Sequence, residues 1–205
     1  MPPKVKKTTG VNVRDPERTR RRILDAALKE FSARGFAGAR IHSIARSAKA
    51  NKRMLYHYFG DKEDLFRAVL EFKLNERMAR FKSYAADGMT EGLPLLFQHN
   101  CDDTDWVRLT AWESLQTIND KLHSWPARRR GAIYTNKLIR QQQEQGRILA
   151  GCKPEHLQLA LASLAIFPIA LPQLTRIITG LPANSPKFRR EYTRFLETIA
   201  AGFRP

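Results

Sequence analysis

The apolar residues of this chain recur at the spacing of helices, and no segment shows the strict alternation of apolar and polar residues that marks a strand. Ile23, Ala27 and Phe31 lie four residues apart, on one face of a first helix. Asp15 is a suitable N-cap for this helix, proline follows at its first position, and Gly35 is a suitable stop. The pattern therefore predicts an all-α protein.

A short amphipathic segment follows, in which Ile41, Ile44 and Ala45 are spaced as one face of a helix. After a tight turn, Asn51 can cap the next segment, because its side-chain oxygen accepts hydrogen bonds from the free amides of the following turn. The segment over residues 52–59 is too short to be stable alone, so neighbouring elements must hold it. Two short helices joined by a tight turn form a helix-turn-helix, whose second helix enters the major groove of DNA.

The rest of the chain is predicted to be helical as well. A long helix starts at Gly60 or Asp61 and runs to about Tyr84. Pro168 and Pro172 should kink the most apolar segment, because each proline removes one backbone donor. Further helices are expected over residues 90–98, 104–118, 127–148, 154–178 and 185–203, which brings the total to about nine.

The charge of the chain is unevenly distributed. Of a formal net charge of +16, residues 1–62 carry +11 (16 Lys and Arg against 5 Asp and Glu) and residues 63–205 carry +5 (20 against 15). A basic segment that contains a helix-turn-helix is typical of a nucleic-acid-binding protein, and a general solubilising charge is the alternative. The basic residues before the first helix form an arm that either reads a minor groove or is attracted to phosphates without specificity.

Several segments of this region together resemble the TetR family of bacterial transcriptional regulators. They are Arg22–Ala27 (RILDAA), Phe31, Gly35-Phe36, Ile44-Ala45 and Leu55–Phe66 (LYHYFGDKEDLF). The resemblance implies a three-helix DNA-binding domain, joined by a long fourth helix to a C-terminal helical domain. On this basis we expect a flexible basic arm over residues 1–15, a helix-turn-helix domain over 16–78 with its motif at 40–59, and an effector-binding and dimerisation domain over 79–205.

The function that this resemblance implies is sequence-specific DNA binding by a transcriptional regulator. We expect a homodimeric repressor that binds a pseudo-palindromic operator and is released by a small-molecule effector, without a cofactor. A transcriptional activator of the same fold, or a general DNA-binding protein without an effector, is the alternative. The sequence contains no Gly-x-Ser-x-Gly, Gly-x-x-x-x-Gly-Lys, His-Glu-x-x-His or Cys-x-x-Cys motif, and its five histidines lack metal-ligand spacing. Neither an enzyme nor a metal site is therefore expected.

The residues expected to contact DNA lie in the motif and directly after it. By resemblance, Tyr56, Tyr58 and Lys62 bind phosphates. Arg53 is expected to read a guanine, and contact with the DNA backbone is the alternative. The complete set is Arg40, His42, Ser43, Lys49, Asn51, Lys52, Arg53, Met54, Tyr56, His57, Tyr58 and Lys62.

Four of these residues depart from the family pattern. Lys49 replaces the usual glycine of the turn, Arg40 replaces a usual capping threonine, and Arg53 and Met54 replace a small residue and a threonine at the start of the recognition helix. If the backbone at Lys49 is left-handed, its side chain costs about 1 kcal/mol relative to glycine, which a phosphate contact could offset. We expect the operator preference of this protein to reside in these four residues.

The last two predicted helices resemble those that pair between two TetR subunits as a four-helix bundle. A helix that is apolar nearly all round needs a partner surface, and a symmetric dimer is the commonest solution. Closure of a monomer's own core is the alternative. The expected interface residues are Leu157, Leu161, Leu164, Phe188, Tyr192, Phe195 and Ile199.

The resemblance also implies an effector pocket within residues 85–180. Such pockets combine aromatic walls with a few polar groups, and a place in the protein core is the alternative for each candidate. Glu113 is expected either to pair with an arginine such as Arg108 or to bind a cationic ligand. The candidate lining residues are Phe97, Trp106, Trp112, Glu113, Gln116, Tyr134 and Phe167.

The remaining features concern the compartment. Cys101 and Cys152 are close neither to each other nor to a histidine cluster, which fits thiols in a reducing cytosol. Residues 1–15 lack the apolar segment of a signal peptide. The most apolar stretch, residues 157–174, contains two prolines and two glutamines, which argues against a membrane span. We expect a soluble, cytoplasmic protein.

Overall fold

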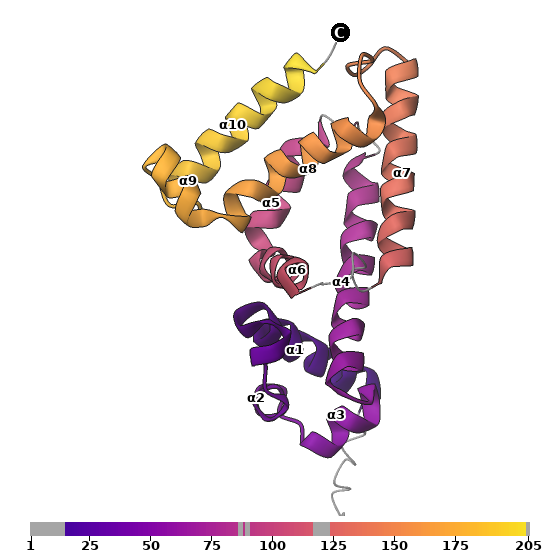
Figure 1. The fold of residues 1–205 in the computed structure, drawn as a ribbon, viewed down its shortest axis with the longest axis vertical. Coiled ribbons are helices and arrows are strands. Elements are labelled where there is room, and N and C mark those ends of the chain that lie inside the picture. Colours follow the sequence, from indigo (N-terminus) through magenta and orange to yellow (C-terminus); the bar gives the residue numbers. More distant parts are fainter. Residues whose placement is uncertain (1–14, 86–87, 89–90, 117–123, 204–205) are drawn as a thin grey trace, which may run out of the picture.

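The computed structural model describes residues 15–85, 88, 91–116 and 124–203, and this part of the chain contains ten helices and no strand (Figure 1). The expected all-α fold is confirmed. The helices are α1 (Pro16–Gly38), α2 (Ile41–Ser47), α3 (Lys52–Phe59), α4 (Lys62–Ala85), α5 (Gly92–Asp102), α6 (Thr104–Gln116), α7 (Trp125–Glu144), α8 (Pro154–Ala170), α9 (Pro172–Thr179) and α10 (Pro186–Gly202).

The N-terminal domain consists of α1 to α3 and the beginning of α4, at the bottom of Figure 1. Its core forms where the apolar face of α1 meets α4: the rings of Phe31 and Phe66 pack edge to face with their centroids 5.0 Å apart. The same core continues into α6, which contributes Trp106, Val107 and Leu109. The N-terminal domain is therefore packed directly against the C-terminal domain.

The C-terminal domain surrounds the far half of α4, which runs upward beside α7 in Figure 1. Its core lies between α5, α8 and α10, where the ring of Phe97 approaches that of Tyr192 to 4.9 Å and Phe188 is 3% exposed. α8 contributes Leu161 to this core and also packs against α7. The helices α4, α5, α7 and α8 thus pack against one another above the N-terminal domain in Figure 1.

The two prolines of the most apolar segment act differently. Pro168 lies inside α8 without ending it, whereas Pro172 begins α9, and the axes of α8 and α9 differ by 92°. A proline at position 168 cannot donate to the carbonyl of Leu164, four residues earlier. The hydroxyl of Tyr192 donates to that carbonyl instead, at 2.9 Å. The predicted single kinked helix is in fact two helices, which accounts for ten in place of about nine.

Other predicted boundaries differ by a few residues. Gly35 leaves the helical conformation, with φ at 67°, but one more turn carries α1 to Gly38. α5 ends at Asp102, four residues later than expected, and α7 ends at Glu144, four residues earlier. Of the expected basic arm, only Asp15 is among the residues that the structure describes, and its carboxylate caps α1 by accepting from the next two free amides.

No single helix in the described part of the chain is long and apolar enough to cross a membrane, although the bent pair α8 and α9 reaches that length and hydropathy together.

Candidate DNA-binding surface and ligand pocket

The recognition helix α3 is anchored by two buried residues and a capped start. Leu55 and Phe59 are 2% and 8% exposed and pack in the core of the N-terminal domain. Asn51 caps the helix as predicted, because its side-chain oxygen accepts from the amide of Met54 at 2.8 Å. Since the inward face is fixed in this way, the opposite face is turned to solvent. It carries the exposed side chains of Lys52, Arg53, Tyr56 and His57.

The turn between α2 and α3 is left-handed at Lys49, where φ is 49°. Lys49 is therefore a residue with a side chain in a conformation that favours glycine, and strain is expected there. Arg22 of α1 holds the turn: it donates from Nε to the carbonyl of Ala48 at 3.1 Å and from Nη2 to the carbonyl of Lys49 at 3.2 Å. Arginine often satisfies the last carbonyls of a helix in this way. The sequence alone does not predict this role for Arg22, because the contact joins residues that are far apart in sequence.

The start of α2 lacks a side-chain cap, as expected for Arg40 in place of threonine. The backbone amide of Arg40 donates to the carboxylate of Glu30 at 3.1 Å, so a residue of α1 satisfies the amide of the N-cap residue itself. The side chains of Arg40 and His42 are exposed, and that of Ser43 is half-buried. These three residues border the exposed face of α3.

Lys62 begins α4 and lies against the end of α1. Its ammonium group donates to the carbonyl of Ala37 at 3.3 Å and lies 4.8 Å from the centre of the Phe36 ring. Of the remaining predicted DNA contacts, Met54 and Tyr58 are half-buried. All twelve residues therefore lie on or beside the two helices of the motif.

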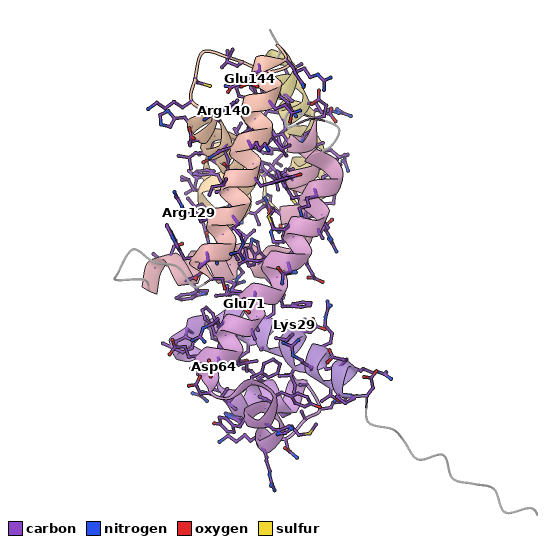
Figure 2. The ribbon with its side chains drawn as sticks, turned by 90° about the vertical axis from the view of Figure 1, so that its right-hand side faces the viewer. Lys29, Asp64, Glu71, Arg129, Arg140 and Glu144 are labelled. Atoms are coloured by element: carbon purple, nitrogen blue, oxygen red, sulfur yellow. The ribbon has the colours of Figure 1, made fainter. Side chains whose placement is uncertain are left out.

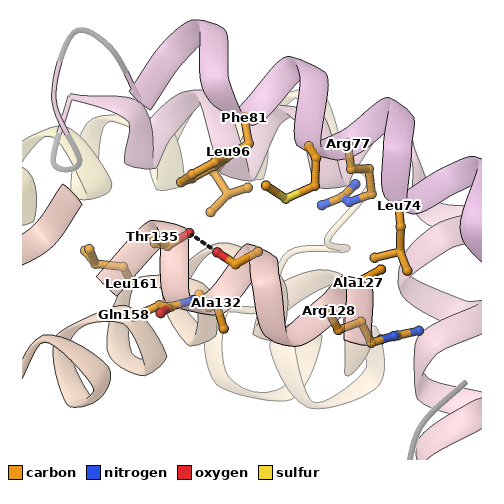
Figure 3. Close-up of a pocket in the computed structure, with 13 residues that line it drawn as sticks. Leu74, Arg77, Phe81, Leu96, Ala127, Arg128, Ala132, Thr135, Gln158 and Leu161 are labelled. Carbon is orange, nitrogen blue, oxygen red and sulfur yellow. Dashed lines mark hydrogen bonds between the residues drawn. The ribbon is translucent and has the colours of Figure 1, made fainter. Parts of the chain in front are cut away.

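A cavity of about 300 Å³ lies in the C-terminal domain between α4, α5, α7 and α8 (Figure 3). One end of it includes Phe81, Leu96 and Leu161, with the polar side chains of Thr135 and Gln158 beside them. The other end includes Leu74 and Arg77 from α4 and Arg128 from α7, whose guanidinium group points away from Arg77. The described lining is Leu74, Arg77, Met78, Phe81, Leu96, Ala127, Arg128, Gly131, Ala132, Thr135, Gln158, Leu161 and Ala162.

The two arginines of the cavity converge on one tryptophan. Their guanidinium carbons lie 5.4 Å (Arg77) and 5.5 Å (Arg128) from the centre of the Trp106 ring. Arg128 also forms an ion pair of 2.6 Å with Glu113, whose side chain is 1% exposed. Burial lowers the pKa of Arg128, and the neighbouring Glu113 carboxylate partly offsets that effect. Because Trp106 belongs to the core shared with α1, the charged end of the cavity is the end nearer the DNA-binding domain.

Comparison with known proteins identifies this architecture. Residues 23–69 match the family described as bacterial regulatory proteins of the tetR family, and residues 95–196 match the tetracyclin repressor-like C-terminal domain. An HTH-type transcriptional repressor of Streptomyces coelicolor is 33% identical over 167 residues, which span 82% of this chain and 86% of that protein. The chain belongs to the TetR family. It is a DNA-binding transcriptional regulator.

Two further relatives of this TetR-family regulator cover different shares of the chain. The HTH-type transcriptional repressor NicS of Pseudomonas putida is 39% identical over 113 residues, which span 52% of this chain and 53% of NicS. The crystal structure of a transcriptional regulator from Streptomyces coelicolor, 23% identical, superposes with a TM-score of 0.72 and covers 88% of this chain and 97% of its own. The latter likeness concerns the fold alone.

The residues that line the cavity of this TetR protein differ from the seven aromatic and polar candidates. Phe97 is fully buried in the C-terminal core, and Trp106 and Glu113 lie behind the two arginines. Glu113 pairs with an arginine, the first of the two alternatives, and that arginine is Arg128. Three other candidates are exposed, and Gln116 ends α6 with its side chain outside the described part. The exposed ones are Trp112, Tyr134 and Phe167.

The cavity is lined on the α7 side by small residues and not by the aromatic residues that were expected. Large aromatic side chains fill space, whereas small ones leave it open. Ala127, Gly131 and Ala132 face α4, and a methyl group added at Gly131 would lie 3.1 Å from the sulfur of Met78. Gly131 therefore lets α7 approach Met78 of α4 closely, and this relation between two helices is not visible in the sequence of either one.

The seven predicted interface residues divide into buried and accessible groups. Leu157, Leu161 and Phe188 are each 3% exposed and pack in the protomer's own core. Leu164, Tyr192 and Ile199 are half-buried, and Phe195 is 45% exposed. Further apolar side chains are exposed on α8, on α9 and at the 92° bend between these helices. They are Leu159, Phe167, Leu171, Leu174, Ile177 and Ile178.

Proposed function

We propose that this TetR protein is a homodimeric repressor that binds a pseudo-palindromic operator through α3 and is released by a small-molecule effector. The observation that carries the proposal is the division of α3 into an anchored and a free face. Leu55 and Phe59 fix the helix, and its exposed face carries donors and rings suited to phosphates and base edges. Repression, and not activation, is supported by two relatives that are named as transcriptional repressors.

Dimerisation is supported by the apolar surface on α8 and α9. Ile177 and Ile178 are 79% and 67% exposed, which is unusual for isoleucine in a monomer. A two-fold axis through this surface would bury the same residues of both subunits. It would also present two copies of α3 to two half-sites, as paired operator recognition requires.

Release by an effector is supported by the path from the cavity to the DNA-binding domain. α4 lines the cavity with Arg77 and reaches the DNA-binding domain at Lys62. α6 packs against α1, where Ser32 donates to the carboxylate of Asp105 at 2.7 Å. A ligand that fits the cavity better in one spacing of the two α3 helices would shift the population toward that spacing.

The proposed function is tested by footprinting the full-length protein on the DNA upstream of its own gene. Two protected half-sites about one helical turn apart are expected, with transcription from that promoter reduced by the protein. Equal affinity for random DNA at physiological salt would contradict the proposal in favour of a general DNA-binding protein. Increased transcription would support an activator.

Dimerisation is tested by the variant Ile177→Lys, measured by sedimentation velocity. A charged group in the apolar interface should convert the dimer to monomers, because a buried unpaired charge costs several kcal/mol. Ile133→Lys is the matched control, since Ile133 is a 56% exposed isoleucine on α7, outside the proposed interface. Dissociation in both variants, or in neither, would argue against this surface as the interface.

A further inference from the structure

A second hollow of the C-terminal domain is positively charged. It is a groove of about 620 Å³ between α6, the bend from α8 to α9, and the start of α10. It shares no described lining residue with the cavity between α4, α5, α7 and α8, so it is a separate site. Its described lining contains neither aspartate nor glutamate but three arginines, which are Arg108, Arg176 and Arg189.

Two of these arginines are free to bind a ligand. Arg108 of α6 and Arg176 of α9 are exposed, and within the described residues neither has a hydrogen-bond or ion-pair partner. The register of α6 explains the position of Arg108. Trp106 and Leu109 are buried in the core, whereas Thr104 and Arg108, four residues apart on one face, line the groove.

The third arginine, Arg189 of α10, forms a fixed wall. It donates from Nη2 to the carbonyl of Cys101 at 3.0 Å, and its Nη1 forms an ion pair of 3.3 Å with Asp102. The side chain of Asp102 is 73% exposed, so water and salt weaken this pair. The lining of the groove therefore keeps a net positive charge.

The bend between α8 and α9 holds Arg176 in place. Pro172 has no amide to donate to the carbonyl of Pro168, four residues earlier. The hydroxyl of Thr175 donates to that carbonyl instead, at 3.1 Å, and Thr175 is 4% exposed. Because the neighbour of Arg176 is fixed in this way, the groove is largely formed before a ligand arrives, which lowers the cost of binding.

The groove and the proposed dimer surface lie on different sides of α9. Leu174, Ile177 and Ile178 are exposed on one side of this helix. Arg176 lies roughly 150° round the helix from the middle of these three residues, at the spacing of 3.6 residues per turn. A partner that covers the apolar side therefore leaves Arg176 in the groove.

We infer that this groove binds the phosphate group of a small molecule. Arginine recognises phosphate through paired hydrogen bonds, and Thr104, Gln173 and Asn184 add neutral donors. A phosphate monoester suits this set better than a carboxylate, because it brings a charge of about −1.5 to −2 and three acceptor oxygens. A volume of about 620 Å³ is within the range of ligand pockets and leaves room for an organic body.

Isothermal titration calorimetry of the full-length protein tests this site with probes that share a body and differ in charge. Glucose, glucuronate and glucose 6-phosphate form one series, and adenosine, adenosine 5′-carboxylate and AMP form a second. The phosphate ester of at least one series should bind ~10-fold or more tightly than its uncharged parent, since charge-assisted hydrogen bonds are the strong ones. Equal affinities within both series, or tighter binding of both carboxylates than of the esters, overturn the inference.

Inorganic phosphate, titrated alongside, distinguishes two sources of the group. An affinity equal to that of the tighter ester identifies the free ion as the ligand. A weaker affinity identifies an organic phosphate, whose body also contacts the groove.

Two variants assign the binding to the groove. Arg108→Met and Arg176→Met should each weaken binding of the tighter ester ~5-fold or more, and their urea midpoints should match that of the unaltered protein, because both side chains are exposed. Arg129→Met is the matched control, since Arg129 is exposed and projects outward from α7, outside the groove (Figure 2). Unchanged affinity in both groove variants, or an equal loss in the control, overturns the assignment.

The DNA backbone also carries phosphates, and the same variants separate it from a small molecule. Both groove variants should bind a random-sequence duplex as tightly as the unaltered protein does. Weaker binding of the duplex by both would place DNA in the groove and overturn the inference. The titrations with small probes contain no operator, so their outcome does not depend on the proposed function.

Discussion

At the scale of single residues, the turn of the helix-turn-helix combines a strained residue with a supporting one. Lys49 adopts a left-handed backbone, which favours glycine. Arg22 accommodates the turn by donating to its carbonyls. The capping role of Asn51 could be predicted from sequence because it depends on neighbours three residues away. The role of Arg22 could not, because it depends on how α1 crosses α2.

The strain at Lys49 can be measured directly. Lys49→Gly should raise the free energy of unfolding by roughly 0.5–1 kcal/mol, because glycine adopts this conformation without a steric penalty. Urea unfolding followed by circular dichroism gives the value. If Lys49 also binds a phosphate, the same variant should bind operator more weakly, so stability and affinity would change in opposite directions. An unchanged or lower stability would mean that the lysine is not strained.

Arg53 and Lys62 should have separable effects on DNA binding. Lys62→Ala should weaken binding to all sequences and reduce the dependence of log affinity on log salt by about one unit, as loss of one phosphate contact requires. Arg53→Ala should instead relax the base preference at one position per half-site. Binding titrations over a salt series and a set of operator variants distinguish the two. A uniform loss for Arg53→Ala would assign it to the DNA backbone.

At the scale of elements, α8 retains an internal proline because another helix replaces the lost bond. Tyr192 of α10 donates to the carbonyl of Leu164, which has no amide partner at Pro168. The apolar residues of α8 and α10 predicted a helix at each place, because they reflect burial within each segment. They could not predict that α8 continues through Pro168, because the donor that replaces the lost hydrogen bond belongs to α10.

The Tyr192 hydroxyl should therefore contribute measurably to stability. Tyr192→Phe keeps the ring contacts with Phe97 and Phe188 and leaves the Leu164 carbonyl without its donor. A loss of about 1 kcal/mol is expected for such a half-buried acceptor. Tyr134→Phe is the control, because Tyr134 is 37% exposed on α7. Equal stabilities of the two variants in urea would contradict this role.

At the scale of the whole molecule, the core of the DNA-binding domain extends into α6 of the C-terminal domain. Trp106 and Leu109 of α6 belong to the same cluster as Ile23 of α1. The division into two functional regions could be predicted from the helix-turn-helix and the charge distribution. The cavity could not, because its lining comes from four helices that are distant in sequence.

This shared core should make unfolding cooperative. A single urea transition is expected by tryptophan fluorescence and circular dichroism alike. Ser32→Ala and Asp105→Asn should show a coupling energy of roughly 1 kcal/mol in a double-mutant cycle, since their side chains hydrogen-bond at 2.7 Å between α1 and α6. Two separate transitions, or no coupling, would indicate domains that move independently.

The two faces of α3 bear on how this regulator can change over evolutionary time. Leu55 and Phe59 stabilise the fold through their burial, whereas Lys52, Arg53 and Tyr56 contribute little to stability because they are exposed. Substitutions on the outer face can therefore accumulate without loss of the fold. After gene duplication, one copy could acquire a new operator through a few such changes while it kept the same effector. Target and signal can thus diverge separately.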